Sequence, residues 1–180
     1  MPRPITADEF EELYRSTAAE LLAYIRRRTS GDAEDLAAEV YAIAWRRRTE
    51  LPPAFLRRAW LFGAARRLIL SDLRRRDREQ ESTEQVAALG WATTADADDQ
   101  LGAAVTAALG RLTPEAREVI LLVEWERLTP GELAVVLGVR PGSARMRLHR
   151  ARQALAADPE LRLLVPAVTP MRSVTGRGRS

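Results

Sequence analysis

Two capping boxes and a series of helical repeats constrain this chain more than any other feature of its sequence. Thr6 precedes Glu9 by three positions, and Thr129 precedes Glu132 by the same interval. At this spacing the hydroxyl and the carboxylate each accept a hydrogen bond from a free amide at the start of a helix. After these caps, apolar residues recur every three or four positions, and no segment shows a convincing strand-like alternation. The sequence therefore predicts an all-α fold.

The expected helices fall into two groups. They cover residues 6–30, 32–51, 54–77 and 101–109, and three more begin at 113, 129 and 141. Residues 77–100 are acidic and weakly periodic, which is typical of a flexible linker. We therefore expect two small helical domains, residues 1–76 and 101–157, followed by a mobile tail over 158–180.

Positive charge is concentrated at the two ends of the chain. All 28 strongly basic residues are arginine, and residues 1–76 carry 15 of them against 11 acidic residues. Residues 139–180 carry nine against two, whereas residues 77–100 carry one against seven. Two basic blocks on either side of an acidic spacer favour two surfaces that bind a polyanion, most simply nucleic acid.

The composition argues against most catalytic and metal sites. Without cysteine there is no thiol nucleophile, disulfide or Cys-ligated metal, and the single histidine, His149, lies among arginines. We therefore expect no catalytic residue, no metal and no cofactor. No apolar run approaches the length of a membrane span, and the N-terminal residues lack the apolar segment of a signal peptide. A soluble, cytoplasmic protein is expected.

Residues 129–155 have the spacing of a helix-turn-helix. A capped helix of about eight residues is followed by a turn at Gly138 and a second helix, which in this motif enters the major groove. The apolar positions are spaced to pack the two helices together. The remaining side chains of the second helix are Arg140, Ser143, Arg145, Met146, Arg147, His149 and Arg150. Arginine binds guanine edges or phosphate with two parallel hydrogen bonds, which favours DNA binding over an ordinary basic hairpin.

Several motifs resemble those of a known family. The C-terminal stretches are LTPEAREV (112–119), LTPGELA (128–134) and GSARMRLHRAR (142–152), and they resemble region 4 of bacterial sigma factors of the extracytoplasmic-function (ECF) group. A similar helix-turn-helix occurs in LuxR-type response regulators, so the N-terminal half must distinguish between the two families. There DAEDLAAEVYAIAW (32–45) resembles sigma region 2.2, and AWLFGAARRLILSDLRRR (59–76) resembles regions 2.3 and 2.4.

The resemblance implies partners and roles for particular residues. Region 2.2 would dock on the β′ coiled coil of core RNA polymerase, through Asp35 and Glu39, which are four apart and share a helix face. Regions 2.3 and 2.4 would melt and hold the −10 element, and region 4 would bind the −35 element and the β flap. The implied −10 residues are Arg58, Trp60, Phe62, Arg66, Arg67, Ser71, Arg74 and Arg75, and the implied −35 residues are Arg140, Ser143, Arg145, Met146, Arg147 and Arg150. An anti-sigma factor is a further possible partner that the resemblance implies.

Some features depart from the family pattern or leave alternatives open. Arg67 stands where many members have Asn, and Met146 stands where a small polar residue is common. Residues 48–53 lie where members carry a pocket for a flipped −10 base. Trp60 and Phe62 are equally compatible with a place in the core. The main alternative is a stand-alone helix-turn-helix regulator that binds duplex DNA without polymerase. A third, a di-metal enzyme, needs two Glu-x-x-His pairs, which one histidine does not supply.

Overall fold

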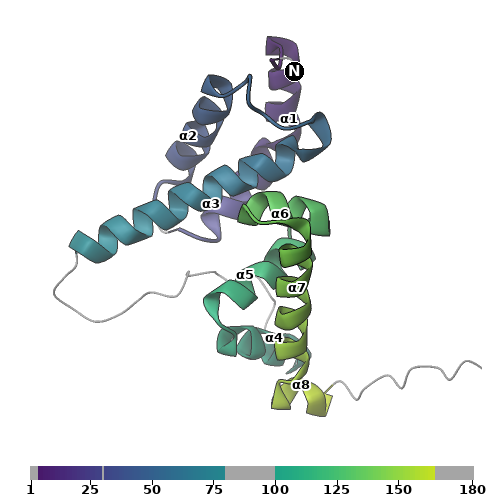
Figure 1. Cartoon of the computed structure of the whole chain (residues 1–180). Coiled ribbons are helices and arrows are strands. Elements are labelled where there is room, and N and C mark those ends of the chain that lie inside the picture. Colours follow the sequence, from purple (N-terminus) through teal and green to yellow (C-terminus); the bar gives the residue numbers. More distant parts are fainter. Residues whose placement is uncertain (1–3, 30, 80–99, 165–180) are drawn as a thin grey trace, which may run out of the picture.

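The protein is built from α-helices throughout the residues that the computed structural model describes, which are 4–29, 31–79 and 100–164 (Figure 1). The N-terminal half contains α1 (Ala7–Arg26), α2 (Ala33–Arg46) and α3 (Ala54–Glu79). The C-terminal half contains α4 (Gln100–Arg111), α5 (Pro114–Glu124), α6 (Pro130–Leu137), α7 (Pro141–Ala156) and α8 (Pro159–Leu164). The all-α prediction is confirmed. Residues 77–79, assigned to the linker from the sequence, continue α3, and the rest of that segment, 80–99, lies outside the described residues.

The helices begin where the sequence places their caps. The Thr6 hydroxyl accepts a hydrogen bond from the Glu9 amide at 3.3 Å, and the Glu9 carboxylate accepts one from the Thr6 amide at 3.0 Å. Thr129 and Glu132 make the same reciprocal pair at the start of α6. Both capping boxes thus satisfy amides that have no partner within the helix.

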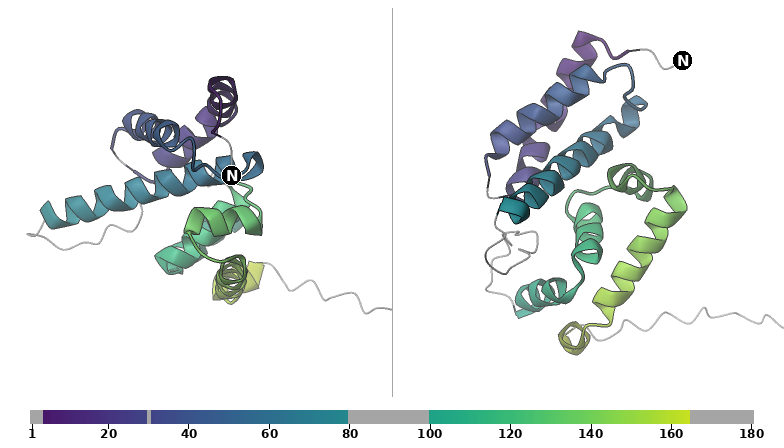
Figure 2. Two further views of the ribbon diagram at one scale, coloured as in Figure 1. Left: turned by 45° about the horizontal axis from the view of Figure 1, so that its top comes forward. Right: turned by 60° about the vertical axis from the view of Figure 1, so that its left-hand side comes forward.

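The three N-terminal helices pack around a small apolar core. Leu21 and Ile25 from α1, Val40 from α2 and Leu61 from α3 are inaccessible to solvent. The hydroxyl groups of Thr17 on α1 and Tyr41 on α2 share a buried hydrogen bond of 2.8 Å. Figure 2 shows α3 as the longest helix, running beneath α1 and α2 and beyond them. Its C-terminal part therefore projects from the bundle.

The helix-turn-helix lies in α6 and α7. Gly138 ends α6 in the left-handed conformation, with φ of 64°, which glycine adopts without steric strain. Ala144, Leu148 and Ala151 are buried on α7 at positions i, i+4 and i+7, so that one stripe of this helix faces the core. The predicted motif is therefore present with its turn at the expected glycine.

The beginning of the expected tail is an ordered helix. The Asp158 carboxylate accepts hydrogen bonds from the Arg111 guanidinium at 2.8 and 2.9 Å and from the amides of Glu160 and Leu161. These bonds hold α8 against α4. Residues 159–164 of the expected tail form α8, because Asp-Pro is a good helix start, with Asp as the cap and Pro in the first turn. Residues 165–180 lie outside the described part of the chain.

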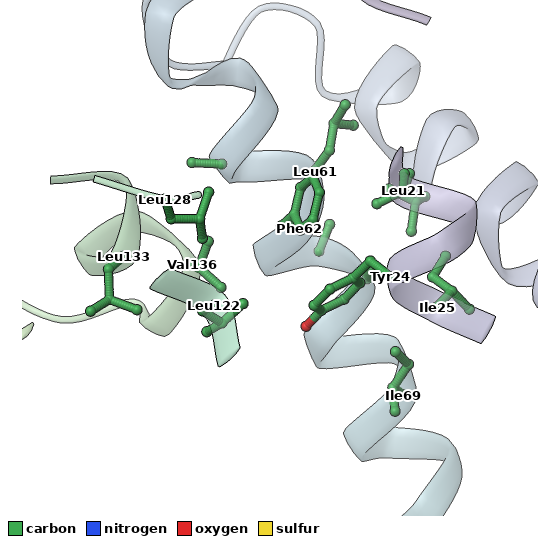
Figure 3. Close-up of a cluster of buried hydrophobic side chains, with 14 of the residues drawn as sticks. Leu21, Tyr24, Ile25, Leu61, Phe62, Ile69, Leu122, Leu128, Leu133 and Val136 are labelled. Atoms are coloured by element: carbon green, nitrogen blue, oxygen red, sulfur yellow. The ribbon is translucent and has the colours of Figure 1, made fainter. Parts of the chain in front are cut away.

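The two halves share one hydrophobic core. Phe62 of α3 and Tyr24 of α1 are fully buried, as are Leu122 of α5 and Val136 of α6. Figure 3 shows the side chains of Leu122, Leu128 and Val136 on one side of this cluster and those of Phe62 and Tyr24 on the other. Here α6 lies against α3. We call this contact between α3 and α1 on one side and α5 and α6 on the other the interdomain seam.

Gly63 allows the closest approach across the seam. A Cβ atom at this position would lie 3.3 Å from the Cα and carbonyl oxygen of Val136, both of them backbone atoms that are not free to rotate away. Glycine inside a helix costs about 1 kcal/mol relative to alanine. Its presence in the middle of α3 is explained by the α6 backbone that packs on it.

Candidate nucleic-acid and polymerase interfaces

The predicted −35 residues gather on the solvent side of α7. All six predicted residues are exposed. Arg140 is the N-terminal cap, and the others lie within the helix: Ser143, Arg145, Met146, Arg147 and Arg150. Among the described residues, none of these four arginines has an ion-pair partner. The N-terminus of α7 and its adjoining face therefore form a basic surface on an α-helix, an element that fits a major groove.

The α7 arginines divide between two sides of the helix. Arg147 and Arg150 line an open cavity of about 590 Å³ between α4, α5 and α7, whose lining also includes Arg66 of α3. Arg145 does not line this cavity. Positions 145 and 147 are about 200° apart around a helix, so that one side chain alone can face the floor of a groove. The two arginines, equivalent in the sequence, are therefore not equivalent in the structure.

The predicted −10 residues divide more sharply. Trp60, Arg67, Ser71 and Arg74 recur at seven-, four- and three-residue intervals and therefore share one face of α3. We call this set, with the neighbouring Arg75, the open face of α3. Trp60 is half-buried, and the other four are exposed. Arg58, Phe62 and Arg66 lie on the opposite side, at intervals of four, and face the seam.

Phe62 has no access to a base in this arrangement. Its ring is fully buried and packs against the Tyr24 ring at a centroid distance of 4.9 Å. The Arg58 guanidinium lies 4.9 Å from the centroid of the Phe62 ring. The placement gives Phe62 a role in the core instead of the base-stacking role expected from the sequence.

Arg66 forms a bidentate ion pair across the seam. Its Nε and Nη2 donate to both carboxylate oxygens of Glu118 on α5, at 2.9 to 3.0 Å. Glu118 is buried, and the Arg66 side chain is 23% exposed. Burial lowers the pKa of Arg66, but the hydrogen bonds and charge of Glu118 outweigh it and leave the pKa raised. The guanidinium is therefore held as a cation by a carboxylate of the other half.

A second group of arginines meets Glu126, just beyond the end of α5. The Glu126 carboxylate accepts hydrogen bonds from Arg27 at 2.6 Å and from Arg28 at 3.3 Å. Its backbone carbonyl accepts a third from Arg58 at 2.8 Å, while Arg58 also pairs with Glu20. Glu126 and Arg28 are both buried. Sequence reasoning missed Glu118 and Glu126, although Glu118 lies inside an otherwise apolar helical stripe, which signals a buried partner.

Arg67 lies in a crowded basic environment on the open face of α3. Partial burial, followed by the charges of Arg47 and Arg66, lowers the pKa of its guanidinium. An anion placed beside Arg67 would relieve this repulsion. Arg67 is thus in a favourable position to bind phosphate.

The predicted polymerase-docking residues lie on α2, away from the seam. Asp35 and Glu39 are both exposed on one face of this helix, and neither has an ion-pair partner among the described residues. The neighbouring Glu34 pairs instead with Arg26 of α1. The sequence prediction of a paired acidic surface thus has the required geometry.

The loop before α3 is anchored at both ends. The Arg48 carbonyl accepts a hydrogen bond from the Ile5 amide at 3.1 Å, and Leu51 is buried. The Arg48 guanidinium lies 5.1 Å from the centroid of the Trp45 ring, and Trp45 is 40% exposed. The Arg48 side chain of this loop therefore lies beside Trp45 of α2 at the surface.

The described part of the chain contains neither a candidate metal cluster nor a candidate membrane span. Within residues 4–29, 31–79 and 100–164, no cluster of three histidine or acidic side chains is suited to a metal ion. None of the helices described there is long and apolar enough to cross a membrane.

Comparison with known proteins identifies both halves. Residues 13–79 match the family model "Sigma-70 region 2", and residues 102–155 match "Sigma-70, region 4". The chain is 32% identical over 163 residues to the ECF RNA polymerase sigma factor SigE of Mycolicibacterium smegmatis, covering 81% of this chain and 60% of SigE. It is 30% identical over 152 residues to the RNA polymerase sigma factor CarQ of Myxococcus xanthus, covering 82% of this chain and 87% of CarQ.

A solved structure is similar over most of the chain. The sigma factor RpoE of Bartonella quintana, crystallised with the anti-sigma factor NepR, matches with a TM-score of 0.62 and 26% identity. The match covers 89% of this chain and all of RpoE. From both family models, the relatives and this structure, the chain belongs to the ECF group of RNA polymerase sigma factors, which bind core RNA polymerase and direct it to promoters.

Proposed function

We propose that this sigma factor engages promoters through two separate surfaces, α7 for the −35 duplex and the open face of α3 for the melted −10 strand. The observation that carries the proposal is that both surfaces present exposed arginines, Arg145 and Arg147 on α7 and Arg67 on α3. On α7, Arg145 reaches base edges, and Arg147 and Arg150 bind phosphate beside the cavity. Bidentate arginine contacts suit both targets.

The open face of α3 combines stacking with positive charge. Trp60 offers an aromatic surface to an unpaired base, and such stacking contributes about 1 to 3 kcal/mol per base. Arg67, Arg74 and Arg75 follow the phosphates of the same strand. Preferential binding of the unpaired form is sufficient to favour melting, and it requires no hydrolysis. The protein therefore acts by binding, without a catalytic group of its own.

We propose that Asp35 and Glu39 dock α2 on a basic surface of core polymerase, the β′ coiled coil, while the C-terminal half meets the β flap. Charge reversal of both residues to Arg is expected to weaken binding to core polymerase, measured by titration of labelled sigma factor. The matched control reverses Glu11 and Glu12, an exposed acidic pair on α1 that contacts Arg15. Wild-type affinity in the α2 variant would refute the docking role.

An anti-sigma factor is a further proposed partner. RpoE of Bartonella quintana, which is similar over nearly the whole described fold, was solved with one bound. Because its partner is core polymerase, the proposed site of action is the bacterial cytoplasm.

The melting role is tested by transcription with reconstituted holoenzyme. Arg67→Ala is expected to reduce permanganate-detected opening at the −10 element while closed complexes still form. Arg15→Ala, an exposed arginine on α1, serves as the control. If Arg67→Ala opens the promoter as well as wild type does, the open face of α3 is not the −10 surface. If the free chain footprints duplex DNA tightly and core polymerase gains no initiation from it, the chain acts as a stand-alone regulator instead.

A further inference from the structure

Met146 is an apolar side chain on the basic surface of α7. It is 51% exposed, and within α6 and α7, which are described throughout, no other large apolar side chain is exposed. Methionine has no hydrogen-bond donor, and its thioether is a weak acceptor, so that it is a poor partner for a phosphate or a polar base edge. The exposed part of Met146 therefore suits an apolar group of a bound molecule.

Met146 occupies the most outward position of its helix. Ala144, Leu148 and Ala151 form the buried stripe of α7. At 100° per residue, Met146 lies about 140° to 160° around the helix from each of them. When α7 enters a major groove, the side opposite the buried stripe is the side that faces the base pairs. Met146 is therefore directed at the floor of the groove.

The surroundings of Met146 favour a close approach to DNA. Arg145 and Arg147 lie about 100° to either side of it, are exposed and have no ion pair within the described parts of the chain. Gly142, one turn earlier on the same side, borders open space, since a Cβ atom there would meet nothing within 4 Å. Positive charge thus flanks Met146, while the absence of a side chain at Gly142 leaves room for base edges beside it.

Only one apolar group lies on the base edges of the major groove. Guanine, cytosine and adenine present hydrogen-bond donors and acceptors there, whereas thymine adds its C5 methyl group. A methionine placed against a donor or acceptor removes water from it without supplying a hydrogen bond, which is unfavourable. Against the methyl group, the same side chain removes apolar surface from water, which is favourable. The chemistry of Met146 therefore matches thymine.

We propose that Met146 is a specificity-determining residue, which selects an A·T pair at one −35 position through the C5 methyl group of its thymine. The inference rests on the proposed −35 role of α7. The arginines on either side supply most of the affinity, and Met146 adds sequence preference. Loss of the methyl group is expected to weaken binding about fourfold, the equivalent of one buried methylene.

The experiment removes the methyl group from the DNA and the apolar side chain from the protein. Holoenzyme reconstituted from the full chain and core polymerase first selects promoters from a library randomised over the −35 element. In a selected duplex, each thymine of that element, on either strand, is then replaced in turn by deoxyuridine, which lacks only the C5 methyl group. Holoenzyme affinity for each duplex is measured by fluorescence anisotropy.

Two variants separate apolar contact from side-chain length. Met146→Gln keeps the length and removes the apolar character, whereas Met146→Leu keeps the apolar character. Circular dichroism establishes that both are folded, as expected for an exposed position. Wild type is expected to lose affinity about fourfold with deoxyuridine at one position. Met146→Gln is expected to bind thymine and deoxyuridine there equally, and Met146→Leu to keep the difference. Arg145→Ala, the control, is expected to bind more weakly but to keep the difference as well.

The role of Met146 is overturned if the selected −35 element contains no A·T pair, or if no deoxyuridine lowers wild-type affinity. It is also overturned if the difference persists in Met146→Gln, because the methyl group then acts through the shape of the DNA itself. Failure of the −35 role is distinguished by Arg145→Ala and Arg147→Ala. If both bind as wild type does, α7 is not the −35 surface. If they bind more weakly while Met146→Gln leaves the thymine preference unchanged, α7 keeps its role and Met146 alone loses it.

Discussion

The two basic helices of this sigma factor use arginine in contrasting ways. On α7 the arginines at the predicted −35 surface are exposed, and in the described ranges none has an ion pair. On α3 the predicted set is split, since Arg67, Arg74 and Arg75 are exposed while Arg58 and Arg66 bind the other half. The difference shows that an arginine-rich helix is not by itself a DNA-binding surface. Packing determines which guanidinium groups are available to bind DNA.

The largest expected effect is on stability and concerns the buried side of α3. Phe62→Ala removes a fully buried ring between α1 and the seam, and it is expected to lower the free energy of unfolding by about 3 to 5 kcal/mol. Urea denaturation measures this change. Phe55→Ala is the control, because this ring on the same helix is 75% exposed. Unchanged stability combined with a loss of promoter opening would return Phe62 to a base-stacking role.

The next prediction concerns the open face of the same helix. Trp60→Ala is expected to weaken the open complex by about 1 to 3 kcal/mol, the contribution of one stacked base. Permanganate reactivity at the −10 element measures opening, and a footprint measures closed complexes. A promoter pre-melted by mismatches is expected to rescue the variant if the defect lies in opening. A drop in folding stability like that of Phe62→Ala would instead place Trp60 in the core.

The third prediction tests whether the two sides of α7 have different roles. Arg145→Ala is expected to cost about 1 to 3 kcal/mol and to relax sequence preference at one −35 position. Arg147→Ala is expected to weaken all promoters alike and to reduce the salt dependence by about one counterion. Holoenzyme binding to promoter variants across a salt series distinguishes the two. If both variants lose affinity in the same pattern, the position of an arginine around α7 does not determine whether it recognises bases or phosphates.

The smallest expected effect is a local pH dependence at α8. Hydrogen bonds from Arg111 hold the pKa of Asp158 below its usual range. The ionised carboxylate therefore contributes stability above the unfolded pKa of about 3.9, and this contribution is lost as pH falls through the lower folded pKa. The Leu161 amide donates to Asp158, so its hydrogen exchange, corrected for the intrinsic pH dependence, is expected to lose protection at acidic pH.

Asp158→Asn provides the comparison for that measurement. Its Leu161 amide is expected to show weaker protection at neutral pH and little further change in acid. Glu160→Gln is the control, because Glu160 is exposed and also contacts Arg111. An acid-dependent loss of protection that persists in Asp158→Asn would assign the effect to another group.

Local signals in the sequence account for most of the helices. Thr6, Asp32, Thr113 and Thr129 all cap helices as their spacing predicts, and Gly138 ends α6 in the left-handed conformation. These features depend on residues within one or two turns, so they are readable without a tertiary structure. The helix after Asp158 was not predicted from the sequence, although Asp is a good helix cap and proline is favoured in the first turn.

The candidate surfaces were predictable only in part. The exposed residues of α7 followed from the buried stripe at Ala144, Leu148 and Ala151, since one apolar stripe determines the opposite side of a helix. On α3 the same reasoning was insufficient. This helix packs against α1 and α2 on some sides and α6 on another, so that several sides are buried and periodicity alone does not identify the free one.

The sequence by itself determined the helical architecture, the helix-turn-helix and the family, because caps, turns and motifs act over short distances along the chain. Only the tertiary structure decided the roles of Phe62, Arg66, Glu118 and Gly63. Each of these residues meets a partner far away in the sequence, and such pairings leave no periodic trace. A buried carboxylate and a helical glycine are unfavourable in isolation, and they become explicable once the opposing arginine and backbone are seen.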